Sequence, residues 1–489
     1  MENPLNSLSH STPTHLFSIT FFLLFTSAWK YSHAELLNGF RVTPNPSISE
    51  FQSLLNDSTG NFSFGFLRVN KVQLALSVVH FPSLEPLWQV NQTNLARWSD
   101  RTELTFNGSL VFSDPRSGVF WSSETEGDKV VLLNSSNLQI IKLQSQPFPS
   151  VVWQSFDYPG NTLVENQNLT SEMSLESSNG LYSLRLGVDF MALYAKFGEG
   201  NGENQIYWKH DPLEARAVII EGNGPILARV DPNGFLGMFQ SEKAPVDIQA
   251  FRSYNLPLNN FLILRLESDG NLKGYLWNGS DWVLDYQAIS DICQLPNPCG
   301  PYSLCKPGLG CSCLDTRTEY SSGTCFAVDQ ESGDLCSNGE AKTQNDNGFW
   351  VLRKGGVDLP FKELMTYKTA PSQGQCESLC ESNCSCWGTV YSNGSGYCYS
   401  LDYPIQTLLG VADESKVGYF KMRERKNRRK IGVGEGIMIG SGLILIGGIG
   451  FGSYRVWKRK RGVEEDGIIP GPYKNLGSDS FRSIEMGSR

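Results

Sequence analysis

The chain has 489 residues, a formal net charge of −9 and 12 cysteines. The acidic excess lies in residues 35–420, because the segment that follows is basic. An acidic protein surface argues against nucleic acid as a partner.

Residues 1–34 predict a secretory signal peptide. An apolar run from Leu16 to Trp29 precedes Ser32 and Ala34, which place small residues at the positions that determine cleavage. The segment has no basic residue before Lys30, so an uncleaved anchor is the alternative. The run is shorter than the roughly 20 residues that span a bilayer, which favours cleavage.

Residues 35–290 are typical of an all-β fold. Short runs rich in β-branched and aromatic residues alternate with Asn-Gly, Asp-Pro and Ser-Gly turn signals. Their length suggests two domains. A strand–turn–strand theme recurs at 104–112, 131–140 and 266–275, and each copy is followed by a tryptophan: Trp121, Trp153 and Trp277. Such repeats imply a closed assembly of similar sheets.

All 12 cysteines lie between Cys293 and Cys398. Such density in a secreted chain predicts small modules held by disulfides, and a group of six cysteines leaves about 15 pairings open. Zinc is the alternative for closely spaced cysteines, but zinc sites favour paired knuckles with histidine in reducing compartments. No histidine lies near, so we expect no metal and no cofactor.

Residues 436–454 carry no charge and are long enough to cross a membrane as a helix. Basic residues flank both ends, so charge does not orient the span. The signal peptide and the oxidised cysteines place the N-terminal side outside. We expect a single-pass type I plasma-membrane protein with a solvated basic stalk at 421–435 and a cytoplasmic tail at 455–489.

The span contains two small-residue pairs, Gly436 with Gly440 and Gly448 with Gly452. Glycines at this spacing allow close helix–helix packing, which predicts a homo- or heterodimer. Simple glycine richness of a membrane helix is the alternative.

Nine Asn-x-Ser/Thr sequons lie on the expected outer side and none lies in the tail. They predict glycosylation at Asn56, Asn61, Asn91, Asn107, Asn134, Asn168, Asn278, Asn383 and Asn393.

Three motifs resemble those of known extracellular domains. The stretch from Trp153 to Leu163, WQSFDYPGNTL, resembles the end of the bulb-type lectin domain of plant S-domain (G-type lectin) receptors. The spacing of Cys299, Cys305, Cys311 and Cys313 resembles an EGF-like domain. The run CESLCESNCSCW, at 376–387, resembles the PAN/apple domain of the same receptors.

This resemblance implies a mainly β, multidomain fold with tandem β-prism domains, disulfide-rich modules and one transmembrane helix. The implied order is a signal peptide at 1–34, a bulb-type lectin-like domain at 35–165, a second lectin-like or S-locus-type domain at 166–290, an EGF-like domain at 291–327, a PAN/apple domain at 333–420, the stalk at 421–435, the transmembrane helix at 436–454 and the tail at 455–489.

The resemblance also implies the disulfide pairs. The EGF-like pattern gives Cys293–Cys305, Cys299–Cys311 and Cys313–Cys325. The PAN pattern gives Cys376–Cys398 and Cys380–Cys386, which leaves Cys384 for Cys336. The lead-in to Cys293 is poor in calcium ligands, so we expect no calcium.

Bulb lectins bind mannose through a strand motif, Gln-x-Asp-x-Asn-x-Val-x-Tyr, whose alternate residues face one side. The first two repeats of this chain have lost most of these residues. The third retains a similar set, which predicts a carbohydrate site of Glu267, Asp269, Asn271 and Tyr275. The alternative, which the sequence favours, is that Asp269-Gly270-Asn271 is an ordinary hairpin turn.

No catalytic motif is present, and the expected tail has no room for the kinase that most family members carry. The sequence therefore predicts no enzyme but a kinase-less receptor-like glycoprotein that binds a mannose-type glycan or a protein ligand. Signalling would pass through a partner membrane receptor kinase. The alternative is a structural, adhesion or decoy protein with degenerate lectin domains and no signalling output.

Overall fold

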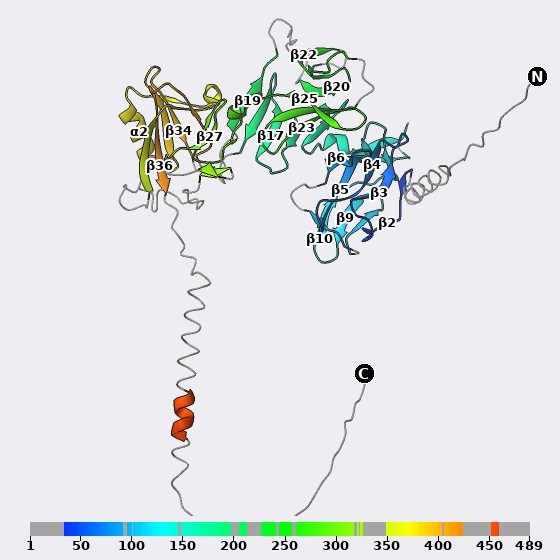
Figure 1. Ribbon diagram of the computed structural model, residues 1–489. Helices are drawn as coiled ribbons and strands as arrows, with labels where there is room; N and C mark the ends of the chain where they lie inside the picture. The colour runs from blue at the N-terminus through cyan, green and yellow to red at the C-terminus, as the bar shows by residue number, and fades with distance from the viewer. Residues whose placement is uncertain are drawn as a thin grey trace, which may run out of the picture. The chain divides into compact units, whose positions relative to one another are not determined.

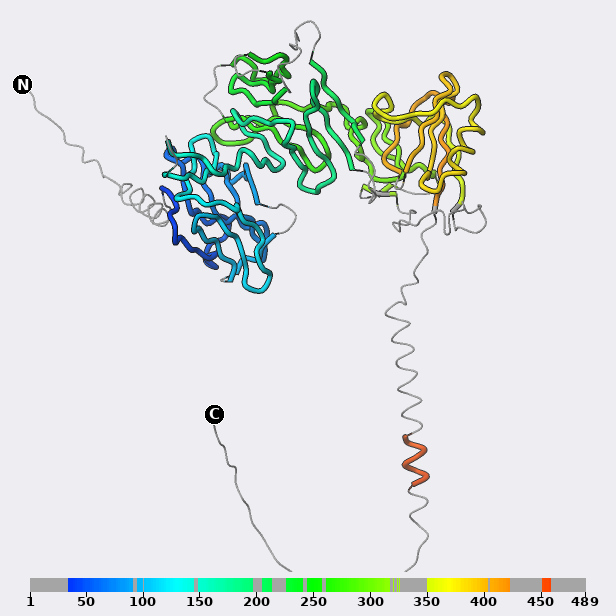
Figure 2. The backbone as a smooth tube through the Cα atoms, turned by 180° about the vertical axis from the view of Figure 1, so that it is seen from behind, coloured from blue at the N-terminus to red at the C-terminus, as the bar shows by residue number. Residues whose placement is uncertain are grey.

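The computed structural model describes residues 34–90, 95–99, 101–144, 148–196, 205–212, 226–240, 244–256, 261–316, 320–321, 323–325, 349–402, 405–423 and 451–458. Strands dominate this part of the chain, as Figure 1 shows and as the tube of Figure 2 traces from behind. The chain forms two compact units, Met1–Glu424 and Arg425–Arg489.

Three sheets form the first half of the β structure, which we call the first prism. The strand orders are β3-β4-β5-β6 with β7 on β5, β10-β9-β8-β2, and β1-β11-β12-β13. Their bounds are β1 (Leu36–Leu37), β2 (Phe40–Val42), β3 (Phe51–Asn56), β4 (Phe62–Arg68), β5 (Gln73–His80), β6 (Glu85–Gln89), β7 (Ala96–Arg97), β8 (Glu103–Phe106), β9 (Leu110–Asp114), β10 (Gly118–Ser122), β11 (Lys129–Leu132), β12 (Leu138–Lys142) and β13 (Ser150–Gln154).

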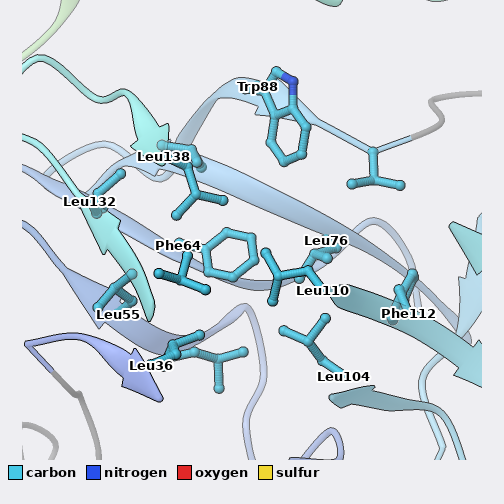
Figure 3. Close-up of a cluster of buried hydrophobic side chains, with 14 of the residues drawn as sticks. Leu36, Leu55, Phe64, Leu76, Trp88, Leu104, Leu110, Phe112, Leu132 and Leu138 are labelled. Carbon is cyan, nitrogen blue, oxygen red and sulfur yellow. The ribbon is translucent and has the colours of Figure 1, made fainter. Parts of the chain in front are cut away.

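Side chains from all three sheets fill one core in the first prism. Strands β8 and β11 alternate half-buried and buried residues, as expected for sheets with one covered face. Phe64, Leu110 and Leu138, one from each sheet, are completely buried. Figure 3 shows these residues meeting side by side, with Trp88 at the edge of the cluster.

A second set of three four-stranded sheets follows, which we call the second prism. The strand orders are β14-β23-β24-β25, β15-β20-β21-β22 and β16-β17-β18-β19. Their bounds are β14 (Thr162–Val164), β15 (Asn168–Leu169), β16 (Ser174–Glu176), β17 (Tyr182–Leu186), β18 (Met191–Ala195), β19 (Gln205–His210), β20 (Leu227–Asp231), β21 (Phe235–Phe239), β22 (Pro245–Ala250), β23 (Phe261–Leu266), β24 (Leu272–Trp277) and β25 (Trp282–Gln287). Because β14 pairs with β23, the second prism begins slightly before the expected boundary at residue 165.

An aromatic cluster around His80 joins the two prisms. His80 ends β5 and is 3% exposed. Its ring lies 4.7 Å from the Trp277 ring and 5.3 Å from the Trp282 ring, both of the second prism. Its Nδ1 lies 2.8 Å from the Ser83 hydroxyl, which also accepts the indole N–H of Trp282. Burial lowers the pKa of His80 from 6.5 to about 4.

The cysteine-rich region forms one body rather than two separate modules. Strand β26 (Ser303–Lys306), from the expected EGF-like segment, pairs with both β27 (Gly310–Cys313) and β35 (Leu408–Gly410), and β35 pairs with β31 (Val357–Asp358). Tyr302 and Leu304 share a buried core with Trp387 and Phe420 of the PAN-like segment. The two expected modules therefore share one sheet and one core.

A five-stranded sheet and one helix complete this region. The strand order is β30-β36-β33-β34-β32, and Ser372 caps the N-terminus of helix α2. The remaining elements are β28 (Tyr320–Ser321), β29 (Thr324–Cys325), β30 (Phe349–Gly355), β32 (Lys368–Thr369), α2 (Gln373–Glu381), β33 (Gly388–Ser392), β34 (Tyr397–Leu401), β36 (Lys416–Arg423) and the 3-10 helices η2 (Ser155–Asp157), η3 (Ile292–Gln294) and η5 (Lys362–Leu364).

Five disulfides hold the region, and each is a pair that the resemblance implies. They are Cys293–Cys305, Cys299–Cys311, Cys313–Cys325, Cys376–Cys398 and Cys380–Cys386. Cys384 is also disulfide-bonded. Its expected partner, Cys336, lies outside the described residues.

The expected stalk at 421–435 begins too early, because residues 421–423 end strand β36. Lys421 is 4% exposed, and its amine donates to the carbonyls of Cys380 and Cys386 at 3.2 and 2.9 Å. These bonds satisfy a buried amine, and Met422 beside it belongs to the core.

Most of the expected membrane span, 436–454, lies outside the described residues, as does the signal peptide. Residues 451–458 are helical. Within the described part of the chain, no helix has the length and apolar character to cross a bilayer.

A buried asparagine fastens the β23–β24 hairpin to the end of β25. Asn271 is 4% exposed. Its side-chain amide donates to the carbonyl of Ile289 at 2.7 Å, and its side-chain oxygen accepts the N–H of Ile289 at 3.1 Å. One side chain thus satisfies both polar groups of a buried peptide position.

We predict that Asn271→Ala lowers the free energy of unfolding by about 2–4 kcal/mol, because it leaves the N–H and C=O of Ile289 without partners in the interior. Asp269→Ala, two residues away and exposed, is the matched control and costs about 1 kcal/mol or less. Chemical denaturation of the full-length variants measures both. Equal losses would contradict the structural role of Asn271.

We predict that His80 makes the protein less stable in acid. The folded pKa is lowered, so between pH 6.5 and pH 4 the unfolded chain binds a proton that buried His80 does not. Stability is complete above the unfolded pKa and declines as pH falls, by about 3 kcal/mol in all. His80→Phe keeps a ring in the cluster, so its melting temperature should fall less between pH 7 and pH 4.5. The same fall in both proteins would exclude His80 as the cause.

Candidate functional site

The predicted sugar-binding residues lie on one hairpin of the second prism. Glu267 and Asp269 precede and enter the turn between β23 and β24, Asn271 ends it, and Tyr275 lies on β24. Gly270 adopts φ of +86° at the centre, which glycine allows. Residues 267–271 therefore form a hairpin turn, which is the alternative interpretation of this motif.

The side chains of this hairpin are already bonded to one another and to the fold. Asn271 is held by Ile289 as described above. Tyr275 donates its hydroxyl to Glu267 at 2.6 Å, and burial together with this bond raises the pKa of Tyr275 above its usual range. Asp269 accepts the N–H of Asn271 and pairs with Lys273 at 3.1 Å. A sugar would have to break these bonds, so the geometry does not favour this hairpin as the site.

The other face of the turn is also covered. Tyr207 donates its hydroxyl to the carbonyl of Gly270, and Asn179 donates to the carbonyl of Ser268. A side chain at position 270 would lie within 3.3 Å of Tyr182 and Pro296. The hairpin is thus a packing element between the second prism and the cysteine-rich region.

A different arrangement marks the first prism, where three tryptophans occupy the same place in their sheets. In each sheet the last strand carries a β-bulge, and a tryptophan follows the extra residue. Trp88 pairs with Val78, Trp121 with Phe112 and Trp153 with Ile140, each next to a register shift. A bulge bends its strand and redirects the next side chain.

The three redirected tryptophans meet edge to face where the sheets converge. Ring centroids are 6.1 Å apart for Trp88 and Trp121, and 5.6 Å apart for Trp153 and each of the other two. Such geometry is favourable for aromatic pairs. Trp88 also donates its indole N–H to the carbonyl of Tyr158 at 2.9 Å, and the Tyr158 ring stacks on Trp153 at 5.9 Å.

A pocket of about 470 Å³ opens above this triad. Its aromatic and apolar lining consists of Trp88, Val90, Trp121, Trp153 and Tyr158, and its polar lining of Gln89, Ser122, Ser123 and Glu124. Trp88 and Trp153 are buried below, whereas Tyr158 is 59% exposed. The volume suits a small ligand, and the lining brings aromatic rings and polar side chains together around it.

The described strands of the second prism do not form such a triad. Its last strands carry bulges at the same places, but the residues that follow are Trp208, Asp247 and Tyr286. Asp247 is buried and lies 2.6 Å from the Nε2 of His210. A buried carboxylate paired with His210 therefore occupies one of the three positions that tryptophans hold in the first prism.

The recurring hairpins gave a partial signal for the pocket. Two of the tryptophans that follow them, Trp121 and Trp153, belong to the triad. Trp277 instead packs on His80. Trp88 lies outside the repeats, and its role depends on a bulge that leaves no mark in the sequence.

Most of the expected glycosylation sites that the structure describes are exposed. Asn61, Asn107, Asn134, Asn278, Asn383 and Asn393 are exposed, and Asn56 and Asn168 are half-buried. Asn91 lies outside the described residues.

Comparisons with known proteins find relatives of this chain. A family model described as D-mannose binding lectin matches residues 86–185, and one described as the S-locus glycoprotein domain matches 238–317. A PAN domain-containing protein of Arabidopsis thaliana is 53% identical over 479 residues, 96% of each chain. The two-domain fetuin-binding lectin of Scilla campanulata is 17% identical, with a TM-score of 0.20 over 52% of this chain and 96% of that one.

A G-type lectin S-receptor-like serine/threonine-protein kinase of Arabidopsis thaliana is 27% identical over 386 residues, which cover 74% of this chain and 44% of the kinase. This chain therefore spans less than half of that relative. The match to the PAN domain protein covers nearly the whole sequence. The chain belongs to the S-domain (G-type lectin) family of plant receptor-like proteins.

Proposed function

We propose that this protein is a cell-surface, receptor-like glycoprotein that binds a glycan in the tryptophan-lined pocket of the first prism. The pocket itself carries the proposal, because its lining residues, 88–158, fall within the match to the mannose-binding lectin model. The hairpin at 267–275 is not included, since its polar groups are bonded internally.

The lining suits the two kinds of surface that a sugar presents, its C–H groups and its hydroxyls. Aliphatic C–H groups carry slight positive charge and pack on the negative face of an aromatic ring. Trp121 and Tyr158 offer such rings at the open side of the pocket, while Gln89 and Ser122 offer hydrogen-bonding groups beside them. A saccharide presents both kinds of surface, whereas a purely apolar ligand would leave the polar groups unpaired.

We further propose that the protein sits in the plasma membrane with its prisms outside and acts as a co-receptor for a membrane kinase. The family membership and the sequons support an outer location. The uncharged stretch at 436–454 supports a single span. In this scheme glycan binding outside alters the association of the span or tail with a partner.

We predict that Trp121→Ala weakens glycan binding by at least tenfold, which corresponds to about 1.4 kcal/mol. Tyr158→Ala should also weaken it, and this change removes an exposed ring without disturbing the carbonyl that accepts from Trp88. The full-length protein, solubilised from the producing cells, is tested on an array of high-mannose and cell-wall glycans.

Val119→Ala is the matched control, because Val119 lies on the same strand β10, is 63% exposed and does not line the pocket. It should bind like the wild type. Absence of binding to any glycan would refute the proposed function. Binding that survives both ring deletions would place the site elsewhere.

We predict that proximity labelling from the tail at 455–489 recovers a membrane receptor kinase, and that this labelling depends on an intact pocket. A Trp121→Ala protein that reaches the cell surface should label the kinase less. If no kinase is recovered from the wild type, the co-receptor role is wrong and an adhesion or decoy role remains.

A further inference from the structure

Among the described residues that line the pocket, Glu124 is the one with a charge. It follows Trp121 by three residues, at the point where the chain leaves strand β10. The residue is exposed, and its carboxylate forms no hydrogen bond or ion pair with any part of the chain that the structure describes. A negative charge thus stands at the rim of a pocket with otherwise neutral walls.

The backbone at Glu124 is held in an unfavourable conformation. Its φ is +52°, in the left-handed region that non-glycine residues other than Asn and Asp rarely adopt. Such a conformation is unfavourable for a glutamate and persists only where neighbouring groups impose it. Strain of this kind collects at ligand sites, where it fixes the direction of a side chain.

Hydroxyl groups around Glu124 impose this conformation. Its backbone N–H donates to the hydroxyl of Ser122 at 3.2 Å. The hydroxyls of Ser123 and Thr125 are 3.0 Å apart, and that of Thr125 donates to the carbonyl of Gly108 at 2.9 Å. The hydroxyl of Ser109 lies 3.1 Å from those of Ser122 and Ser123, within hydrogen-bond distance of each. The rim is therefore anchored on both sides of Glu124 to the turn that begins strand β9.

We propose that Glu124 determines which glycans enter the pocket: its carboxylate accepts hydrogen bonds from sugar hydroxyls and repels acidic sugars. The expected ligand is a glycan in which the sugar unit that contacts Glu124 carries no charge. This inference rests on the proposed function, because it concerns the same pocket. A carboxylate accepts from two neighbouring hydroxyls at once, and bonds to a charged acceptor are stronger than neutral ones. A uronic acid in the same place would bring two negative charges together.

The test compares mannotetraose with the same oligosaccharide after oxidation of its C6 hydroxyls to carboxylates. The two probes share ring geometry and linkage and differ in charge. Dissociation constants are measured for the full-length wild type and for Glu124→Gln, which keeps the shape of the side chain and removes the charge. Glu126→Gln is the matched control, because Glu126 is also exposed, lies two residues away and does not line the pocket.

We expect the wild type and Glu126→Gln to prefer the neutral probe by at least tenfold in low salt. Glu124→Gln should bind the neutral probe several-fold more weakly and show less than threefold preference. Raising the salt from 20 to 500 mM should reduce the wild-type preference, since salt screens exposed charges.

The outcomes separate the two proposals. If binding requires Trp121 but the preference is the same in Glu124→Gln, the pocket is a glycan site and the role of Glu124 is refuted. If the wild type binds the oxidised probe as well as the neutral one, the role of Glu124 is likewise refuted. If neither probe binds and no array glycan binds, the proposed function fails together with this inference.

Discussion

A small sheet with one apolar face is stable only when that face is covered, and this constraint shapes both prisms of the protein. In the first prism three sheets cover one another, so that Phe64, Leu110 and Leu138 lose all contact with water. Each such side chain contributes about 1.5–3 kcal/mol. The last strand of each sheet must bend to close the assembly, and the bulges that bend it also direct the three tryptophans into one place.

The second prism also covers the apolar faces of its three sheets, but with different residues. We therefore assign ligand binding to the first prism and a packing role to the second. Its bulges present Trp208, Asp247 and Tyr286, and its best sugar-like motif is bonded to Ile289 and covered by Tyr207. It also contacts both neighbours: the ring cluster at His80 joins it to the first prism, and Gln205 donates to the carbonyl of Leu364 in the PAN-like segment. The second prism thus connects the pocket-bearing prism to the cysteine-rich region.

Local sequence signals predicted the elements but not how they join. Turn pairs and alternating apolar residues indicated the β fold, and cysteine spacing with a family resemblance gave five disulfides that the structure contains. The sugar-like motif allows two interpretations, because the residue types that bond a sugar are also those that fasten a hairpin. Asn271 can serve either purpose, and its two hydrogen bonds to Ile289 favour the hairpin. The pocket depends on Trp88, Trp121 and Trp153 meeting through bulges, which no local pattern records.

The most direct test of this account is an experimental structure of the full-length protein with a bound neutral oligosaccharide. We expect a sugar ring packed on Trp121 and Tyr158, with hydroxyls directed toward Glu124, while the hydrogen bonds between Asn271 and Ile289 stay intact. A sugar bound instead along Glu267, Asp269 and Asn271, with those bonds broken and the tryptophan pocket empty, would contradict it.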